Sequence, residues 1–370
     1  MNFDNNRISA TQLGSILLLT IVGTGILTLP RALAEAVGPD GWILILIGGI
    51  ITIGLVLIHT YIVKSFPGKR YIEILSETLS KPVAYFLVAL YVIYFIILNG
   101  SLVRIFSEVV KMFLLLRTPI EVIIFTILLV AAYLARSGIE ALARMAELLV
   151  PLIFIPSIIL FALATQGSDL TNLMPVLETS IEDLIAGIPT IVFSFLGFEI
   201  LLIFGYYVNK PKQVMKKSSI AILVAMAIYS LLNIVTIAQF GVEQTVHLNW
   251  PTLSLFKTIE FPGLFIENVE AVVMGMWVMT VFMSIAPLLL VKVILLGDLF
   301  GARDNRFFAL PLLPLLYFIA LSADSMAAAY SYLDIFVNYT APAVLLGVPI
   351  LIIIVMKIKK TSKREGDANV

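Results

Sequence analysis

Apolar stretches alternate with short polar segments along the whole of the 370-residue chain. Most are about 17–25 residues long, which is the length an α-helix needs to cross a bilayer. They are Ala10–Ala36, Trp42–Val63, Val83–Leu116, Ile120–Leu134, Leu148–Leu163, Ile185–Tyr207, Ser218–Phe240, Val269–Leu296, Phe307–Leu321 and Leu333–Met356. The pattern predicts an all-α polytopic membrane protein with about ten transmembrane helices. The first stretch lacks a small-residue cleavage site, so it is interpreted as a span rather than a signal peptide.

The basic residues between these spans are distributed unevenly. With the N-terminus placed in the cytoplasm, 19 of the 24 Lys and Arg residues fall on cytoplasmic segments, Lys292 among them. Cytoplasmic loops of membrane proteins carry such an excess, so both termini are predicted to be cytoplasmic. The tail 358–370 is basic and polar, and we expect it to be disordered and close to anionic lipid.

Composition agrees with this class and excludes several others. Hydrophobic residues make up 60% of the chain and charged residues 13%, so lipid has to cover most of its surface. There is no cysteine, and the two histidines, His59 and His247, are interpreted as interfacial polar residues rather than metal ligands. The net charge of zero gives no sign of a nucleic-acid partner. No nucleotide-binding loop or nucleophile motif is present, so neither a cofactor nor an enzyme activity is expected.

Two spans contain features that interrupt an α-helix near the middle of the bilayer. The first has Gly23, Thr24 and Gly25 followed by Ile26, and the sixth has Phe195, Leu196, Gly197 and Phe198 followed by Glu199. Five spans precede the sixth and five begin with it, so the halves 1–165 and 184–357 would be inverted relative to each other. Matched interruptions in two inverted halves are typical of transporters that bind their substrate at broken helices. The alternative for the glycines alone is a close-packing patch for a neighbouring helix.

Broken helices offer specific chemistry to a ligand. The half-helix that starts near Ile26 presents free N–H groups and a positive dipole to a carboxylate. The carbonyl groups at Val22, Phe195 and Leu196 can accept hydrogen bonds from an ammonium group. Together these groups are suited to a zwitterion, so an α-amino acid or a similar small polar molecule is the expected ligand.

Several other polar residues are candidates for the same site. Glu199 carries a carboxyl group in an apolar span. It is either a functional residue, which binds a proton or the ligand, or the acceptor of a structural hydrogen bond. Tyr94 and Asn99 in the third span and Thr280 and Ser284 in the eighth either line the cavity or join helices together. Arg104, Glu108 and Lys111 form either a solvated helix face or a buried charge network. The loop Gly241–Asn268, with a short helix expected over Pro251–Ile259 and Trp250 at the membrane interface, is either a lid or a plain connector.

Five segments resemble the GerAB-type spore germination permeases, within the amino acid–polyamine–organocation transporter superfamily. They are Gly23–Ala32, Asp40–Trp42, Arg117–Ile120, Ser194–Glu199 and Trp250–Phe256. The resemblance covers nearly the whole chain, and the combination of the glycine motif with the tryptophan–proline segment is more specific than the glycines alone.

This resemblance implies a LeuT-like fold with helices 1 and 6 broken, in the spore inner membrane. It also implies that the chain is the B subunit of a nutrient germinant receptor, with an A-type membrane subunit and a C-type lipoprotein as partners. Gly23, Thr24, Gly25, Ile26, Phe195, Leu196, Gly197 and Glu199 would then surround the germinant, commonly an amino acid. The alternative function is a proton-coupled amino acid transporter, with Glu199 or the Arg104 cluster on the proton route.

Overall fold

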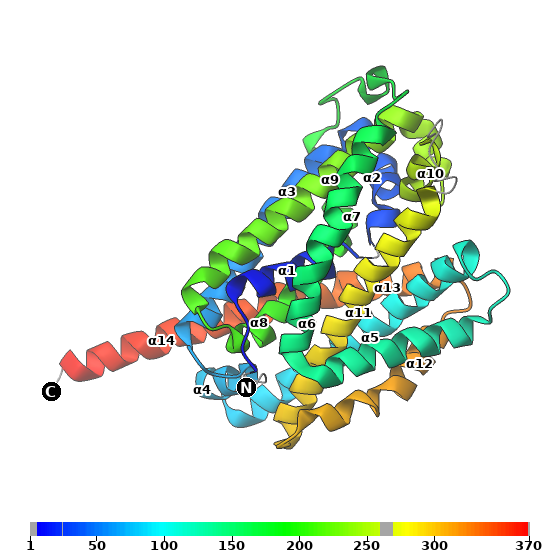
Figure 1. The fold of residues 1–370 in the computed structure, drawn as a ribbon. Helices are drawn as coiled ribbons and strands as arrows, with labels where there is room; N and C mark the ends of the chain where they lie inside the picture. Colours follow the sequence, from blue (N-terminus) through cyan, green and yellow to red (C-terminus); the bar gives the residue numbers. More distant parts are fainter. Residues whose placement is uncertain (1–5, 24, 260–268, 369–370) are drawn as a thin grey trace.

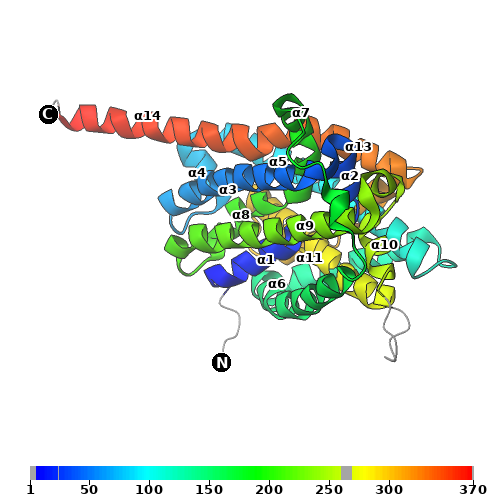
Figure 2. The same ribbon diagram turned by 90° about the horizontal axis from the view of Figure 1, so that it is seen from above.

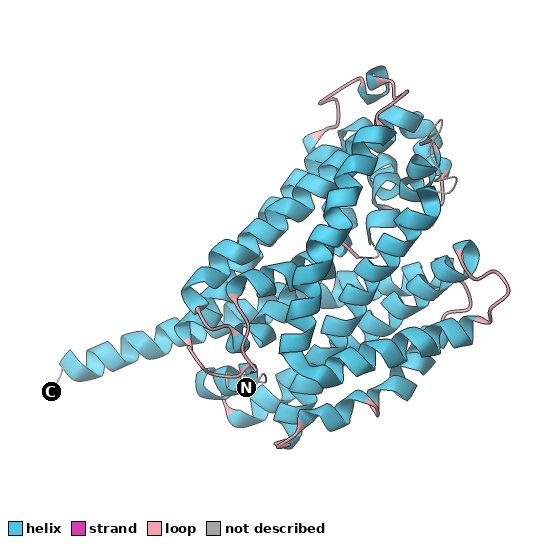
Figure 3. Cartoon of the chain, viewed as in Figure 1, coloured by secondary structure: helices cyan, strands magenta, loops and turns pink. Residues whose placement is uncertain are grey.

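The structure, a computed structural model, describes residues 6–23, 25–259 and 269–368. These residues form helices joined by turns and loops, without a strand (Figure 3). Most of the described residues in each of the ten apolar stretches are helical. The helices are α1 (Ala10–Ile21), α2 (Leu29–Val37), α3 (Gly41–Ser65), α4 (Tyr71–Thr78), α5 (Lys81–Phe113), α6 (Ile120–Ala164), α7 (Ile181–Val192), α8 (Leu201–Phe204), α9 (Pro211–His247), α10 (Pro251–Lys257), α11 (Val269–Phe300), α12 (Leu312–Leu321), α13 (Met326–Ala341) and α14 (Val348–Ala368).

The prediction of an all-α polytopic membrane protein is confirmed. Within the described residues, six helical segments are long and apolar enough to cross a membrane, and three shorter apolar helices accompany them. Large apolar side chains such as Ile50, Phe86, Phe125, Ile155 and Phe318 are exposed on the outside of the bundle. Exposed side chains of this kind are stable only against lipid.

Helix α6 contains both the fourth and the fifth predicted spans. Its backbone leaves the helical region at Gly138, where φ is 87° and ψ is −180°. The helix changes direction sharply along its course (Figure 1). This conformation suits a residue without a Cβ atom, so one glycine replaces the loop expected between the two spans.

The bundle has two ends that differ in structure. Helix α4, the start of α1 and the projecting α14 gather at one end, which we call the α4 end (Figures 1 and 2). Helix α10 and the loop after α5 lie at the opposite end, which we call the α10 end. The tail expected to be disordered instead continues α14 as helix to Ala368, because the transmembrane helix before it supplies a formed template for further turns.

Helix α1 lies in the interior, against α9, α6 and α11. It begins with a capping box, in which Ser9 and Gln12 exchange hydrogen bonds with each other's backbone N–H groups. The middle of α11 is almost completely buried, although it is as apolar as the lipid-facing helices. The first half-helix therefore ends inside protein rather than in lipid, and side chains there can satisfy its free backbone groups.

Candidate functional site

The first span is broken at the predicted place. Helix α1 ends at Ile21, a 3-10 turn covers Gly25–Leu27, and α2 begins at Leu29. A Cβ atom on Gly23 would lie 2.1 Å from Oγ of Ser284 on α11, so a larger residue cannot occupy this position without displacing that helix. Thr24, also predicted to be a site residue, lies outside the described residues.

The sixth span is broken as well. Helix α7 ends at Val192, a 3-10 turn covers Phe193–Phe195, and a second 3-10 turn at Phe198–Ile200 leads into α8. Between them Gly197 has a φ of 112°, and a Cβ atom there would lie 2.7 Å from Cγ2 of Thr20 on α1. Both the backbone conformation and the close approach to α1 thus require glycine at this position.

The two breaks face each other. The Cα of Gly25 approaches Ser194 so closely that a Cβ on the glycine would be 3.2 Å from the serine Oγ. The hydroxyl of Tyr229 on α9 lies 2.8 Å from the carbonyl oxygen of Ile21 and 2.9 Å from that of Ser194. A single buried phenol therefore ties the end of the first half-helix to the second break.

Side chains also satisfy other carbonyl groups next to the breaks. Ser284 Oγ lies 3.0 Å from the carbonyl oxygen of Thr20, and Thr252 on α10 donates to that of Ile26 at 2.7 Å. Backbone groups that lose their helical partners inside a membrane protein require such replacements. The contact with Ile26 also attaches α10 directly to the first break. Trp250, expected at the membrane interface, is instead buried against the ring of Phe113, because its large apolar ring gains more by packing within the protein.

A small cavity lies between the breaks. Its volume is about 20 Å³, enough for one water molecule. It is lined by Thr20, Ile21, Gly25, Leu98, Leu102, Leu196, Gly197, Ser284 and Leu288. In this conformation the site is closed, and a ligand as large as an amino acid requires the breaks to separate.

A second, polar cavity lies next to the closed one and has a volume of about 650 Å³. Residues of α2, α7 and α13 line it, including the ion pair between Arg31 and Glu35 (2.8 Å) and the carboxyl group of Asp334. Ser194, which borders Gly25, is also on its wall, as is Asn249 from the segment before α10. This cavity offers an approach to the breaks that is lined by charged and polar side chains.

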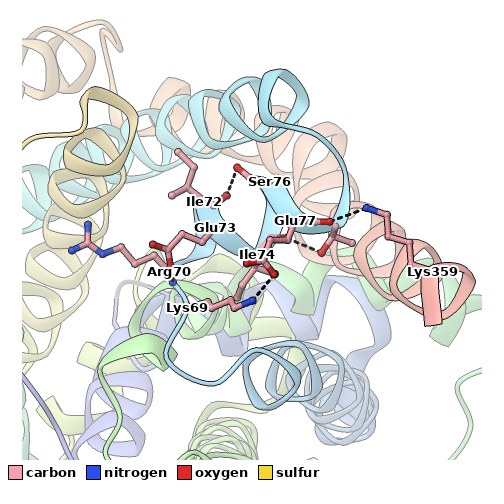
Figure 4. Close-up of polar contacts among 9 residues, drawn as sticks. Lys69, Arg70, Ile72, Glu73, Ile74, Ser76, Glu77 and Lys359 are labelled. Atoms are coloured by element: carbon pink, nitrogen blue, oxygen red, sulfur yellow. Dashed lines mark hydrogen bonds and ion pairs between the residues drawn. The ribbon is translucent and has the colours of Figure 1, made fainter. Parts of the chain in front are cut away.

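The α4 end of the same region is closed by polar contacts. Backbone hydrogen bonds of 2.9 Å join Ile8 to Tyr207 and to Asn209, which follow α8. Arg70 before α4 forms an ion pair with Asp298 of α11 at 2.9 Å. Figure 4 shows α4 itself, whose residue Glu77 pairs with Lys69 and accepts a hydrogen bond at its carbonyl from Lys359 of α14. The segment before α1, the end of the sixth span, α11 and α14 are all held to this end.

Glu199 lies fully buried beside the second break. Its carboxyl oxygens accept hydrogen bonds from the hydroxyl of Tyr94 (3.1 Å) and from the backbone N–H of Gly197 (2.8 Å). The acid thus occupies the start of the second half-helix, where the helix dipole favours a negative charge. The structure thus brings together two predicted site residues, Tyr94 and Glu199. Neither lines the closed cavity, but Glu199 contacts Gly197, which does.

Lys292 was assigned to a cytoplasmic segment, and this assignment is wrong. The residue is fully buried on α11, and its Nζ lies 3.3 Å from the carbonyl oxygen of Phe95 on α5. Its flanking residues are all apolar, and the sequence gives no indication of whether such a helix ends before or after the lysine. Phe95 directly follows Tyr94, so two buried ionisable groups, Glu199 and Lys292, bind neighbouring residues of α5.

His59 was interpreted as an interfacial residue, and this interpretation is also wrong. It is fully buried on α3, and its ring lies 5.2 Å from the ring of Phe198 in the second break. Its Nε2 donates to the carbonyl of Leu345 at 3.0 Å, in a π-helical segment, Pro342–Gly347, between α13 and α14. Pro349 has no N–H, so it removes the helical donor four residues after Leu345. The histidine is buried because this carbonyl needs a partner.

Tyr91 of α5 also donates a hydrogen bond to a carbonyl of the π-helical segment, that of the residue before Leu345. Its hydroxyl donates to Val344 at 2.7 Å. The segment is therefore attached through side chains to α3 and α5, and through His59 to the second break. An interruption of this kind inside a helix frequently marks a functional position.

The charged cluster of the third span is partly buried. Arg104 is 7% exposed, forms an ion pair with Glu108 at 2.7 Å and lies 3.4 Å from the carbonyl oxygen of Ala320. No ion pair joins Lys111 to Glu108 in the part of the chain that the structure describes. None of the three charged residues lines the closed cavity.

Some of the remaining predicted site residues line the closed cavity, and others do not. Gly25, Leu196, Gly197 and Ser284 line the closed cavity. Phe195 packs edge-on against Tyr229 at 5.5 Å, and Phe198 packs against His59, so neither ring lines it. Sequence reasoning missed Thr20, Leu98, Leu102, Leu288 and Tyr229. Leu98 and Leu102 follow Tyr94 at intervals of four residues, so all three lie on one face of the helix. This spacing could have identified the two leucines as lining residues.

These features define the class of the chain as an all-α polytopic membrane protein of permease type, with two broken helices around a central site. The chain belongs to the spore germination protein family (Spore_permease), which it matches over residues 7–329. The resemblance read from its motifs is therefore confirmed.

Individual relatives agree with this membership. The chain is 27% identical over 361 residues to Spore germination protein YndE of Bacillus subtilis (strain 168), covering 97% of this chain and 99% of that protein. It is 33% identical over 269 residues to Spore germination protein A2 of the same organism, covering 72% and 74%. It is 28% identical over 363 residues to Spore germination protein GerLB of Bacillus cereus, covering 97% and 96%.

Proposed function

We propose that this chain is the ligand-binding membrane subunit of a nutrient germinant receptor, and that it binds an amino acid between its two helix breaks. Family membership supports the role in germination. The observation that carries the ligand site is the opposition of the breaks, in which Gly25 meets Ser194 and Tyr229 contacts carbonyl groups of both. Free N–H groups of one half-helix and carbonyl groups of the other provide for the two charges of the ligand.

Binding would act as the signal because the site is closed in this conformation. A cavity of about 20 Å³ has to expand before an amino acid enters, so the ligand favours a conformation in which the breaks are further apart. A ligand that binds one conformation better than another shifts the population toward it. In a receptor complex, the A-type membrane subunit and the C-type lipoprotein would respond to this shift.

The polar cavity at the α10 end would be the entry route. The distribution of basic residues supports a cytoplasmic location for the α4 end and both termini, and this cavity would then face the outer side of the spore inner membrane. The halves 1–165 and 184–357 would be inverted repeats, with one break each.

A substitution at Gly25 tests the site. Gly25→Leu places a branched side chain in the closed cavity and against Ser194, so the nutrient response of spores is expected to be lost while the protein still accumulates in the membrane. Gly54→Leu is the matched control, because a Cβ atom on Gly54 of α3 meets nothing within 4 Å. An unaltered dose–response of the Gly25 variant to a mixture of the common L-amino acids would remove this segment from the pocket.

A second candidate function is a proton-coupled amino acid transporter. Glu199 favours it, because a buried carboxyl group bonded to both the second break and Tyr94 is placed to exchange a proton as the breaks move. Uptake of labelled amino acids into liposomes that contain only this chain tests it. Accumulation driven by a pH gradient would replace the receptor proposal, and its absence would support that proposal.

A further inference from the structure

A third cavity lies against the first break, and no residue of the second break lines it. Its volume is about 320 Å³. Val22, Ile26 and Leu27 form one wall, and Trp277 of α11 forms another. Apolar residues of α6, α9 and α10 complete the lining. A molecule in this cavity would contact the segment that follows the first half-helix.

The lining selects a hydrocarbon. The described lining residues include no charged group, and each of their three hydroxyl groups donates a hydrogen bond to a backbone carbonyl. Ser157 donates to Ile153 at 2.7 Å, Thr252 to Ile26 at 2.7 Å and Thr280 to Met276 at 2.9 Å. A polar ligand would lose its hydration here and find few partners in return. One donor remains, the buried indole N–H of Trp277, and the carbonyl of a lipid ester is able to accept from it.

The opening of the cavity faces the lipid-covered surface. Ile158 on α6 is 62% exposed, and Leu231 and Val224 on α9 are 40% and 38% exposed. They continue the row of exposed apolar residues that includes Ile155 and Leu223 on the same two helices. A molecule that reaches the cavity between α6 and α9 therefore comes from the hydrocarbon of the bilayer.

We propose that this cavity is a lipid site, occupied by one acyl chain of a bilayer lipid that supports the first break from behind. An acyl chain fits the apolar lining, the lipid-facing entrance and the satisfied hydroxyl groups. A chain that moves into the cavity from the surrounding lipid gains mainly van der Waals contact with the walls. Lipid composition would then influence how readily the break moves, and this consequence rests on the proposed function.

Quenching of Trp277 fluorescence by brominated lipids tests the occupancy. Trp277 is buried within the protein, and the full-length chain with Trp42→Phe and Trp250→Phe retains it as its one tryptophan. The protein is reconstituted in phosphatidylcholine vesicles with and without bromine on the acyl chains. We expect Trp277 emission to be lower in the brominated vesicles, because a quenching chain lies in the cavity that the indole lines.

Two filling variants on α6 locate the quenching chain. Ser157→Phe fills the proposed site, and Thr126→Phe fills a separate apolar crevice of about 680 Å³ between α5, α6 and α11. Both residues donate to the carbonyl four positions earlier at 2.7 Å, so the two substitutions remove the same interaction. This control matters because Phe106, which lines the second crevice, stacks on Trp277 at 5.7 Å. Ser157→Phe should abolish the loss of emission, and Thr126→Phe should preserve it.

Three results would overturn the proposal. They are equal emission in both kinds of vesicle, quenching that Ser157→Phe leaves unchanged, and quenching by aqueous acrylamide in place of bromine, which would indicate a water-filled cavity. None of these measurements uses a nutrient, so the lipid site can fail while the amino acid site holds, or the reverse. In spores, Ser157→Phe but not Thr126→Phe is expected to shift the nutrient dose–response.

Discussion

The hydroxyl of Tyr229 is the contact whose removal most directly tests closure of the site. It lies within hydrogen-bond distance of a carbonyl from each break, and the ring of Phe195 packs against its own ring. Tyr229→Phe deletes the hydroxyl and keeps the ring. The substitution therefore removes one tie between segments that have to separate when a ligand enters.

The size of the effect follows from the burial of the groups. Tyr229 is fully buried, so its loss leaves a carbonyl without a donor in an apolar interior, which costs about 1–3 kcal/mol. Because this penalty applies to the closed conformation, it shifts the equilibrium toward the open one by about 5- to 150-fold. Ligand binding no longer has to break the tie, so the apparent affinity should rise by a factor in that range.

Two measurements check this reasoning. The dose–response of spores to a mixture of the common L-amino acids should move to lower concentration, and the purified protein should unfold at a lower temperature. Tyr85→Phe on α5 is the control, since Tyr85 is 47% exposed on the outside of the bundle. A dose–response that moves to higher concentration, or one that does not move although the protein is destabilised, would refute the idea that Tyr229 holds the site closed.

Three further substitutions have expected outcomes. Glu199→Gln removes a carboxyl group that can titrate, so it should flatten the pH dependence of the nutrient response; an unchanged profile would mean that the acid serves packing alone. His59→Phe leaves the Leu345 carbonyl without its donor, and should lower the unfolding free energy by about 1–3 kcal/mol in a denaturation assay, whereas equal stability would show that another donor replaces it. Arg70→Ala leaves the carboxylate of Asp298, whose side chain is 5% exposed, without its ion-pair partner, so the unfolding free energy should fall by about 1–3 kcal/mol while the α4 end opens more readily; a spin-label distance across that end that stays unchanged would contradict this.

The sequence predicted the spans and both breaks, because the signals for them are local. A run of apolar residues indicates a segment that lies in lipid, and glycines within such a run indicate a position where the helix can be interrupted. It also predicted that Glu199 and Tyr94 would be important, since polar groups within apolar spans need partners.

The sequence could not predict which partners meet across the bundle. Tyr229 and His59 each stand in an apolar helix, and nothing nearby in the chain specifies the carbonyl that each one satisfies. Lys292 was misplaced for the same reason: hydropathy describes a helix as a whole and does not reveal which of its faces is turned inward. The helical tail after Met356 was missed because its basic composition resembles that of an unstructured segment.

The π-helical segment between α13 and α14 has a mechanical consequence. It is fixed to the bundle by His59 and Tyr91, and α14, which follows it and projects from the body (Figure 1), is held to α4 through Lys359. At 1.5 Å per residue the part of α14 between the π-helical segment and Lys359 is about 18 Å long. A shift of the ring of Phe198 against His59 would therefore be passed along one stiff helix to the α4 end.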